Sequence, residues 1–313
     1  MQKKYLWIFL GIALVAILGY AIGKDLIKKD LKQEISVPSQ TKMKVVGTFY
    51  PLAYFAEQVG GERVAVMNIT PAGVEPHDFE PTLQDMRKVF SAKVFLLNGG
   101  GFDSWAEKMK SDLSEKGILV VDMQRSIPFM DARTGTEFKA DPHIWLDPVL
   151  AQQEVQLIRD AFIKADPSHE DVYKKNADFF LSQLQNLDSQ FRIGMASCQR
   201  KEIVTSHAAF GYLAKRYNLV QISIAGLSPD EEPSAQQLAR IVELVKRHQI
   251  QYIFFETLVS PKLSETVARE TGALAVPLNP LEGLTDDEIK SGKTYLTEMR
   301  EHLVKLRAAL QCQ

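Results

Sequence analysis

The segment VAVMNI at residues 64–69 is followed by the loop PAGVEPHDFEPT at residues 71–82. The first segment is apolar and rich in β-branched residues, which predicts a buried strand, and a helix is predicted to begin at Leu83. His77 therefore lies in a loop at the C-terminal end of a strand. The three prolines of the loop stiffen it, because proline fixes φ and disfavours helix. One histidine in a loop is weak evidence for a site.

The same pattern occurs twice more along the chain. His143 lies in DPHIWLDP, and His207 directly follows the strand-like segment EIVTS. Three histidines at the ends of strands in an α/β chain predict one metal site between two sheets. The other histidines lie in polar helical sequence, where we expect solvated surface positions: His169, His248 and His302.

Length and composition describe a globular protein with room for two domains. The chain has 313 residues, of which 45% are apolar and 24% are charged, and such a chain can form two hydrophobic cores. The formal net charge of −2 gives no electrostatic reason to expect a nucleic-acid partner.

The N-terminus predicts export. Residues 5–22 contain no charge over 18 positions, and Lys3 and Lys4 precede them. This length is close to the minimum for a membrane-spanning helix and long for the apolar core of a signal peptide. We therefore expect residues 1–22 to be a signal or membrane-anchor helix, and residues 23–42 to be a polar tether. The folded part then lies in the periplasm or on the outer face of the cytoplasmic membrane.

From residue 43 onward, short strands alternate with helices, and a long helical block interrupts them. We expect an N-terminal α/β lobe at residues 43–166, a linking long helix within 167–197, and a C-terminal α/β lobe at 198–313. Residues 123–141 are expected to form a long loop that delivers His143. Alternating strands and helices predict mainly parallel sheets flanked by helices, with ligands at the C-terminal ends of the strands. All three candidate histidines are expected at such ends.

A zinc site needs a fourth ligand, and two glutamates compete for this position. Zinc binds imidazole nitrogen and carboxylate oxygen, with four ligands in a tetrahedral arrangement when the site is closed. Glu282 lies in the loop after the last predicted strand, and Glu256 ends the strand before it.

Four segments resemble the zinc branch of the metal-binding receptors of ABC importers, the ZnuA/AdcA-like family. They are EPHDFEP around His77, DPHIWLDP around His143, TSHAAFGYLAKRY around His207 and LNPLEGLT around Glu282. The resemblance extends from about residue 44 to the end of the chain. It implies two α/β lobes joined by one long helix, with the metal in the cleft and these four residues as its ligands. Glu256 matches a family segment but not a ligand position.

The resemblance also implies cargo and partners. Zn²⁺ is the expected cargo, and an importer permease and ATPase are the expected partners of a monomeric receptor. The manganese branch has a carboxylate where this chain has His207, and additional imidazole favours zinc over manganese. The loop before His143 lacks the histidine-rich run of some zinc receptors.

Other functions stay open. A manganese receptor is the alternative within the family. Three histidines with an open fourth position would also suit a zinc hydrolase, but the sequence has no HExxH motif, and we expect no enzyme. A cell-surface adhesin without transport is a third alternative.

Cys198 and Cys312 are the only cysteines, and we predict a disulfide between them. In a parallel α/β lobe each helix returns to the N-terminal ends of the strands. Cys198 precedes a predicted strand and Cys312 ends the last helix, so both lie on the face opposite the metal. Export permits this bond.

Overall fold

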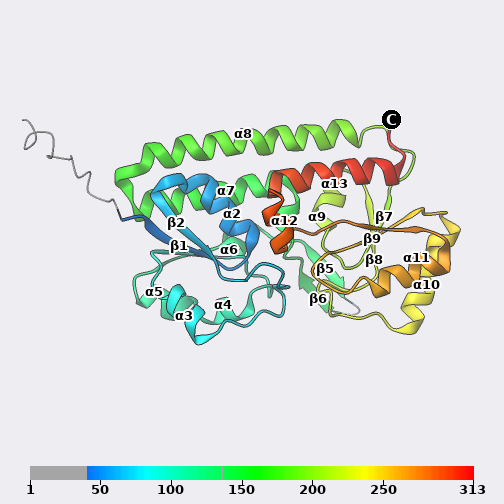
Figure 1. The fold of residues 1–313 in the computed structure, drawn as a ribbon, viewed down its shortest axis with the longest axis horizontal. Helices are drawn as coiled ribbons and strands as arrows, with labels where there is room; N and C mark the ends of the chain where they lie inside the picture. The colour runs from blue at the N-terminus through cyan, green and yellow to red at the C-terminus, as the bar shows by residue number, and fades with distance from the viewer. Residues whose placement is uncertain (1–40, 135–136) are drawn as a thin grey trace, which may run out of the picture. The chain divides into compact units, whose positions relative to one another are not determined.

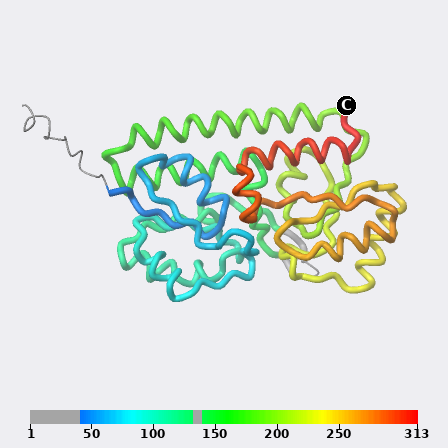
Figure 2. Tube along the Cα trace, viewed as in Figure 1, coloured from blue at the N-terminus to red at the C-terminus, as the bar shows by residue number. Residues whose placement is uncertain are grey.

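The computed structural model describes residues 41–134 and 137–313 (Figures 1 and 2). The description below concerns the compact unit Lys42–Gln313. The predicted signal or anchor helix lies outside the described residues, as does nearly all of the predicted tether. Within the described part of the chain, no helix combines the length and the apolar character needed to cross a bilayer.

The first sheet has four parallel strands in the order β2-β1-β3-β4. They are β1 (Met43–Gly47), β2 (Val64–Asn68), β3 (Val94–Leu97) and β4 (Leu119–Asp122). The prediction of a buried strand at residues 64–69 is wrong in one respect. β2 is an edge strand, so Val64 is buried while Ala65 and Met67 face solvent. Helices α2 (Tyr50–Gly60), α3 (Leu83–Val89), α4 (Ser104–Lys108) and α5 (Lys110–Glu115) belong to this lobe.

The segment predicted as a loop at residues 123–141 contains regular structure. It begins with the short helix α6 (Met123–Ser126) and continues as an antiparallel hairpin of β5 (Asp131–Thr134) and β6 (Glu137–Ala140). The strand sequences DART and EFKA pair with each other and contain no apolar run, so they gave no strand signal. His143 therefore follows a hairpin, and its predicted place at the end of a parallel strand is wrong.

The second sheet repeats the first, with parallel strands in the order β10-β9-β7-β8. They are β7 (Glu202–Thr205), β8 (Val220–Ser223), β9 (Tyr252–Phe255) and β10 (Leu274–Pro277). The helices of this lobe are α9 (Gly211–Arg216), α10 (Ala235–Arg247), α11 (Lys262–Thr271), α12 (Asp286–Lys290) and α13 (Tyr295–Leu310). Two parallel sheets flanked by helices confirm the predicted fold class.

Helix α8 (Glu170–Gly194) packs against elements of both lobes and confirms the predicted long linking helix (Figure 1). It follows α7 (Pro148–Ala165) after one turn of 3₁₀ helix, and it contacts α2 of the first lobe and α13 of the second. Its buried residues recur every three or four positions, which places them on one face. They are Tyr173, Ala177, Phe180, Leu181, Leu184, Leu187, Phe191 and Gly194.

One hydrophobic cluster extends through both lobes on the side of α2, α7, α8 and α13. It contains Phe49 and Phe55 of the first lobe together with Leu213 and Leu306 of the second. Two smaller clusters fill the opposite faces of the two sheets, under α3–α5 and under α10–α11. The lobes therefore share a core, and this core holds the loops at their strand ends close together.

Two further predictions are tested in the second lobe. The Cys198–Cys312 disulfide is present and joins the segment before β7 to the end of α13. The surface position expected for His302 is wrong, because its side chain is fully buried, and burial lowers its pKa to about 3. His302 continues the buried face of α13 that includes Tyr295, Met299 and Leu306, so helical periodicity was the better guide.

Candidate metal centre

His77 reaches the site from the loop after β2. The carboxylate of Glu75 accepts hydrogen bonds from the backbone N–H groups of His77 and Asp78 over 3.1 and 3.3 Å, which fixes the turn. The ring of Phe102 packs edge-on against the imidazole, with 4.5 Å between their centroids. The backbone N–H of Gly73 donates to the carbonyl oxygen of Leu284, which ties this loop to the other lobe.

His143 lies between the hairpin and α7, and Asp141 orients both its backbone and its ring. One oxygen of Asp141 accepts the backbone N–H of His143 over 3.0 Å and lies 2.8 Å from its Nδ1. Asp147 then caps α7 by accepting the N–H of Val149, and Pro148 occupies the first turn. Arg216 of the second lobe pairs with Asp147 over 2.7 Å. The DPHIWLDP motif is thus held from both sides.

His207 follows β7, and Glu256 at the end of the neighbouring strand β9 supports it. The two side chains are about 1% exposed, and 2.9 Å separates His207 Nδ1 from Glu256 Oε1. Thr205 and Gln221 donate to the carbonyl oxygen of His207 over 2.7 and 3.1 Å. Because Nδ1 faces Glu256, Nε2 is the nitrogen that points into the site.

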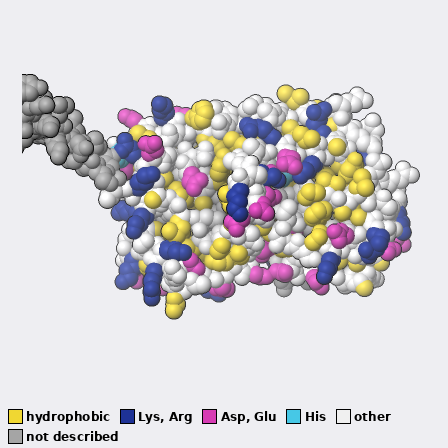
Figure 3. Space-filling model, in the orientation of Figure 1, with side chains coloured by type: hydrophobic (Ala, Val, Ile, Leu, Met, Phe, Trp, Pro, Cys, Tyr) yellow, Lys and Arg dark blue, Asp and Glu magenta, His cyan; other side chains and the backbone are white. Residues whose placement is uncertain are grey.

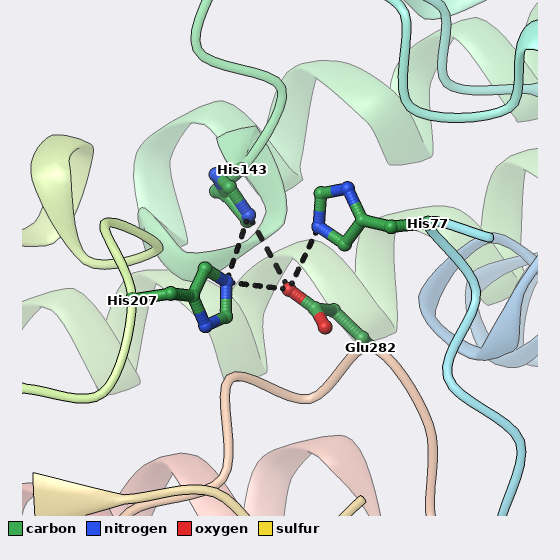
Figure 4. A group of neighbouring side chains, drawn as sticks. All are labelled: His77, His143, His207 and Glu282. Atoms are coloured by element: carbon green, nitrogen blue, oxygen red, sulfur yellow. Dashed lines mark hydrogen bonds and ion pairs between the residues drawn. The ribbon is translucent and has the colours of Figure 1, made fainter. Parts of the chain in front are cut away.

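Glu282 lies in a tight turn after β10. Asn279 shapes this turn: its Oδ1 accepts the N–H of Leu281 over 2.8 Å, and its Nδ2 donates to the carbonyl oxygen of Gly283. Leu281 has φ = 61°, a left-handed conformation that is unfavourable for a residue with a side chain. The turn directs the carboxylate of Glu282 toward the three imidazoles (Figure 4).

These four side chains converge so that one ligand atom of each lies within 4.8 Å of the others. Glu282 Oε1 is 3.5 Å from Nε2 of His77, 3.3 Å from Nε2 of His143 and 3.2 Å from Nε2 of His207. The Nε2 atoms of His143 and His207 are 3.3 Å apart. A tetrahedral zinc ion with bonds of about 2.0–2.2 Å places its ligand atoms about 3.3–3.6 Å apart. The observed distances of 3.2–3.5 Å are close to this spacing.

Charge and burial act together on these groups. Burial by itself lowers the pKa of His207, but the carboxylates of Glu256 and Glu282 raise it well above its usual value. Burial likewise opposes protonation of His143, and Asp141 and Glu282 raise its pKa. The pKa of His77 is lowered, because burial outweighs the attraction of Glu282. A divalent cation would replace the protons that balance these carboxylates.

The site approaches solvent beside His77. Its side chain is 9% exposed, whereas those of the other three residues are at most 1% exposed. A cavity of about 340 Å³ reaches His77 between Phe102 of the first lobe and Leu227 of the second. Figure 3 shows basic and acidic side chains interspersed on the face of the molecule in view.

Three carboxylates gather near the same loop, one ligand atom of each within 4.8 Å of the others: Glu75, Asp78 and Asp230. Burial and the charge of Glu282 raise the pKa of Glu75 to about 8. Asp78 belongs to the first lobe and Asp230 to the second, so carboxyl groups of both lobes meet here, and a hydrogen bond to Asp78 raises the pKa of Asp230.

The structure thus brings together all four residues that the resemblance implied. Glu256, the competing glutamate, does not face the cluster and instead contacts His207 from behind. Sequence reasoning missed Asp141 as a partner of His143, although its place two residues earlier was a usable signal. It also missed Trp145, whose neighbours in space are distant in sequence.

Comparison with known proteins identifies the family. The model of the family described as zinc-uptake complex component A periplasmic, ZnuA, matches residues 45–309. The chain belongs to this family. A relative in Bacillus subtilis, described as high-affinity zinc uptake system protein ZnuA, is 37% identical over 280 residues, which cover 86% of this chain and 88% of the relative. The Streptococcus pyogenes relative described as zinc-binding protein AdcA is longer, and the match covers 58% of its length.

Solved structures of ZnuA-like proteins share the fold. The Zn(II)-bound ZnuA-like domain of Streptococcus pneumoniae AdcA is 37% identical, with a TM-score of 0.76 over 86% of this chain and 99% of that domain. The laminin-binding protein Lmb of Streptococcus agalactiae is 34% identical, with a TM-score of 0.79 over 86% of this chain and 100% of Lmb. It is described as bifunctional, with adhesin and metal-transporting activity.

Proposed function

We propose that this protein is an extracytoplasmic receptor that captures Zn²⁺ and delivers it to an ABC-type importer built from a permease and an ATPase. His77, His143, His207 and Glu282 are the proposed ligands. The main support for the proposal is the geometry of the buried site. The Nε2 atoms of the three histidines lie 3.2–3.5 Å from Oε1 of Glu282, and those of His143 and His207 lie 3.3 Å apart. Membership in the zinc-uptake family supports the transport role.

Zinc suits this donor set better than manganese does. Three imidazoles and one carboxylate satisfy a tetrahedral Zn²⁺, whereas Mn²⁺ prefers oxygen ligands and binds most N/O sites more weakly. His207 supplies the third nitrogen, so it is the residue that we expect to set the preference. The manganese receptor remains the alternative within the family.

A binding role also fits the site better than hydrolysis does. Catalytic zinc sites keep one coordination position open for water, whereas here four protein groups surround the same point. Glu256 does not serve as a free base, since its Oε1 contacts both His207 and Ser206. We therefore propose a receptor without catalytic activity.

Competitive calorimetry with Zn²⁺ and Mn²⁺ tests the proposal. The wild-type protein should bind one zinc ion and prefer it to manganese. The variant His207→Glu exchanges an imidazole for a hard oxygen ligand and should narrow the zinc-over-manganese ratio. An unchanged ratio would show that His207 does not set selectivity. A wild type that bound manganese more tightly, or no metal, would overturn the functional assignment.

Location and assembly follow from the receptor role as proposals. We propose export through the N-terminal apolar segment, a monomeric receptor, and the lobe boundaries 43–166, 167–197 and 198–313. Deleting the gene should impair growth in zinc-depleted medium, and added zinc should restore growth whereas manganese should not.

The similarity to Lmb favours adhesion as a second candidate function. Binding of the purified protein to laminin-coated surfaces, compared with a coated surface lacking laminin, tests this activity separately from zinc uptake.

A further inference from the structure

Trp145 connects segments that carry two of the proposed ligands from opposite lobes. It follows His143 by two positions, is fully buried, and has its ring centroid 5.3 Å from that of His143. Its indole N–H donates to the carbonyl oxygen of Pro280 over 2.8 Å. Pro280 precedes Glu282 by two positions. One buried hydrogen bond therefore joins the segment of His143 to the turn of Glu282.

The turn of Glu282 needs support from outside. Leu281 holds a left-handed conformation with its side chain fully buried. Such conformations persist only where the surrounding structure fixes them, and they concentrate at ligand-binding segments. Asn279 braces the turn from within through its bonds to Leu281 and Gly283. The indole of Trp145 braces it from the other lobe.

Trp145 is itself firmly placed. The hydroxyl of Tyr295 donates to its carbonyl oxygen over 2.6 Å, inside the protein. Its ring packs against Phe49 and Phe102, with centroid distances of 4.7 and 5.2 Å. Phe102 in turn packs against His77. The indole thus contacts, directly or through one side chain, the segments of His77, His143 and Glu282.

We propose that Trp145 is a positioning residue for zinc binding. Its N–H holds the turn of Glu282 at the distance from His143 that a tetrahedral ion requires. The inference rests on the proposed function, since it takes zinc as the cargo and Glu282 as a ligand. Without the bond the carboxylate gains freedom that zinc binding must remove, so the bound ion dissociates more readily.

The variant Trp145→Phe tests this role, because it keeps a large apolar ring and removes the N–H donor. The zinc dissociation constant, measured by competition with a fluorescent chelator, should rise up to about 10-fold. Loss of a group bonded directly to a metal ligand costs about 10- to 100-fold, and Trp145 bonds instead to the backbone beside Glu282. Tyr173→Phe is the matched control. It removes a hydroxyl that donates to Asp166 over 2.8 Å near the start of α8, and it should leave zinc affinity unchanged.

A double-mutant cycle separates positioning from a general loss of packing. In the Glu282→Ala background Trp145→Phe should cost nothing further, because Trp145 acts through Glu282. A merely structural residue would lower affinity by the same factor in both backgrounds. Wild-type affinity in Trp145→Phe, or an equal loss in both backgrounds, would overturn the inference.

A second variant keeps the test decisive if Trp145→Phe does not fold. Tyr295→Phe removes the hydrogen bond that holds the backbone of Trp145, and it should produce a smaller loss that again depends on Glu282. A loss independent of Glu282 would count against the proposal. Absence of zinc binding by the wild-type protein would instead overturn the proposed function, before any variant is compared.

Discussion

Removing the carboxylate behind His207 should weaken zinc binding without removing a ligand. When Nε2 of His207 holds the ion, Nδ1 carries the proton and donates it to Glu256 Oε1, 2.9 Å away. Both side chains are about 1% exposed, so this hydrogen bond lies in the protein interior. In Glu256→Ala the buried Nδ1–H of His207 loses its carboxylate acceptor.

The size of the effect follows from this geometry. A buried hydrogen bond to a charged group contributes about 1.5–3 kcal/mol, and each 1.4 kcal/mol changes an equilibrium constant about tenfold. Glu256→Ala should therefore raise the zinc dissociation constant by about 10- to 100-fold. Glu256→Gln keeps an oxygen acceptor at the same place and loses only the charge, so it should cost less than about tenfold.

Chelator competition at neutral pH measures both variants, and the chain offers a matched control. Glu202 pairs with His248 Nδ1 over 3.1 Å, but these side chains are 29% and 42% exposed. Glu202→Ala removes the same kind of pair at the surface, where it contributes little, and should leave zinc affinity unchanged. A folded Glu256→Ala protein with wild-type affinity would refute the reasoning. A loss as large as that of Glu282→Ala would instead indicate that Glu256 is itself a ligand.

Three further outcomes are expected. His143→Ala removes a proposed ligand and should weaken zinc binding by more than about 100-fold in the same competition assay. This loss exceeds the one expected from removing a supporting carboxylate. Unchanged affinity and stoichiometry would make the site assignment wrong. Zinc affinity should fall between neutral pH and about pH 5. The pKa values of His143 and His207 are raised by neighbouring carboxylates, so protons compete more strongly with zinc for these imidazoles as the pH falls. A flat calorimetric profile over this range would contradict the reasoning. Replacing both Cys198 and Cys312 by Ser should lower the free energy of unfolding by about 4–5 kcal/mol in a denaturant titration, since the disulfide closes a loop of 114 residues. A thiol count on the unfolded, unreduced exported protein checks the disulfide itself. Two free thiols would exclude it.

Local sequence was sufficient where one segment carried its own signal. The strand–loop pattern around His77 and the helical block that became α8 are such cases. Motif resemblance then selected Glu282 over Glu256, a choice that spacing alone left open. The hairpin before His143 was missed because its two short polar strands pair only with each other.

Contacts between distant segments could not be predicted in this way. Whether β2 is an edge or a central strand depends on its neighbours in the sheet, which its own apolar pattern does not specify. The support of His207 by Glu256 depends on β7 and β9 being adjacent, although about 50 residues separate them in the chain. The hydrogen bond from Trp145 to Pro280 joins residues 135 positions apart. Sequence thus indicated the proposed ligands better than the residues that position them.

These supporting contacts explain how a site between two lobes can be ordered before an ion arrives. The shared hydrophobic core joins the lobes along α8, and Arg216 and Asp147 pair across them. Tyr212 donates to the carbonyl oxygen of Asp141, next to His143. Because these contacts hold the segments together, they would lower the entropy cost of ordering the proposed ligands around zinc. His77 differs, since it is the most exposed of the four. His143 and His207 each have a carboxylate beside Nδ1 in addition to Glu282, and among the residues that the structure describes no such second carboxylate contacts the ring of His77.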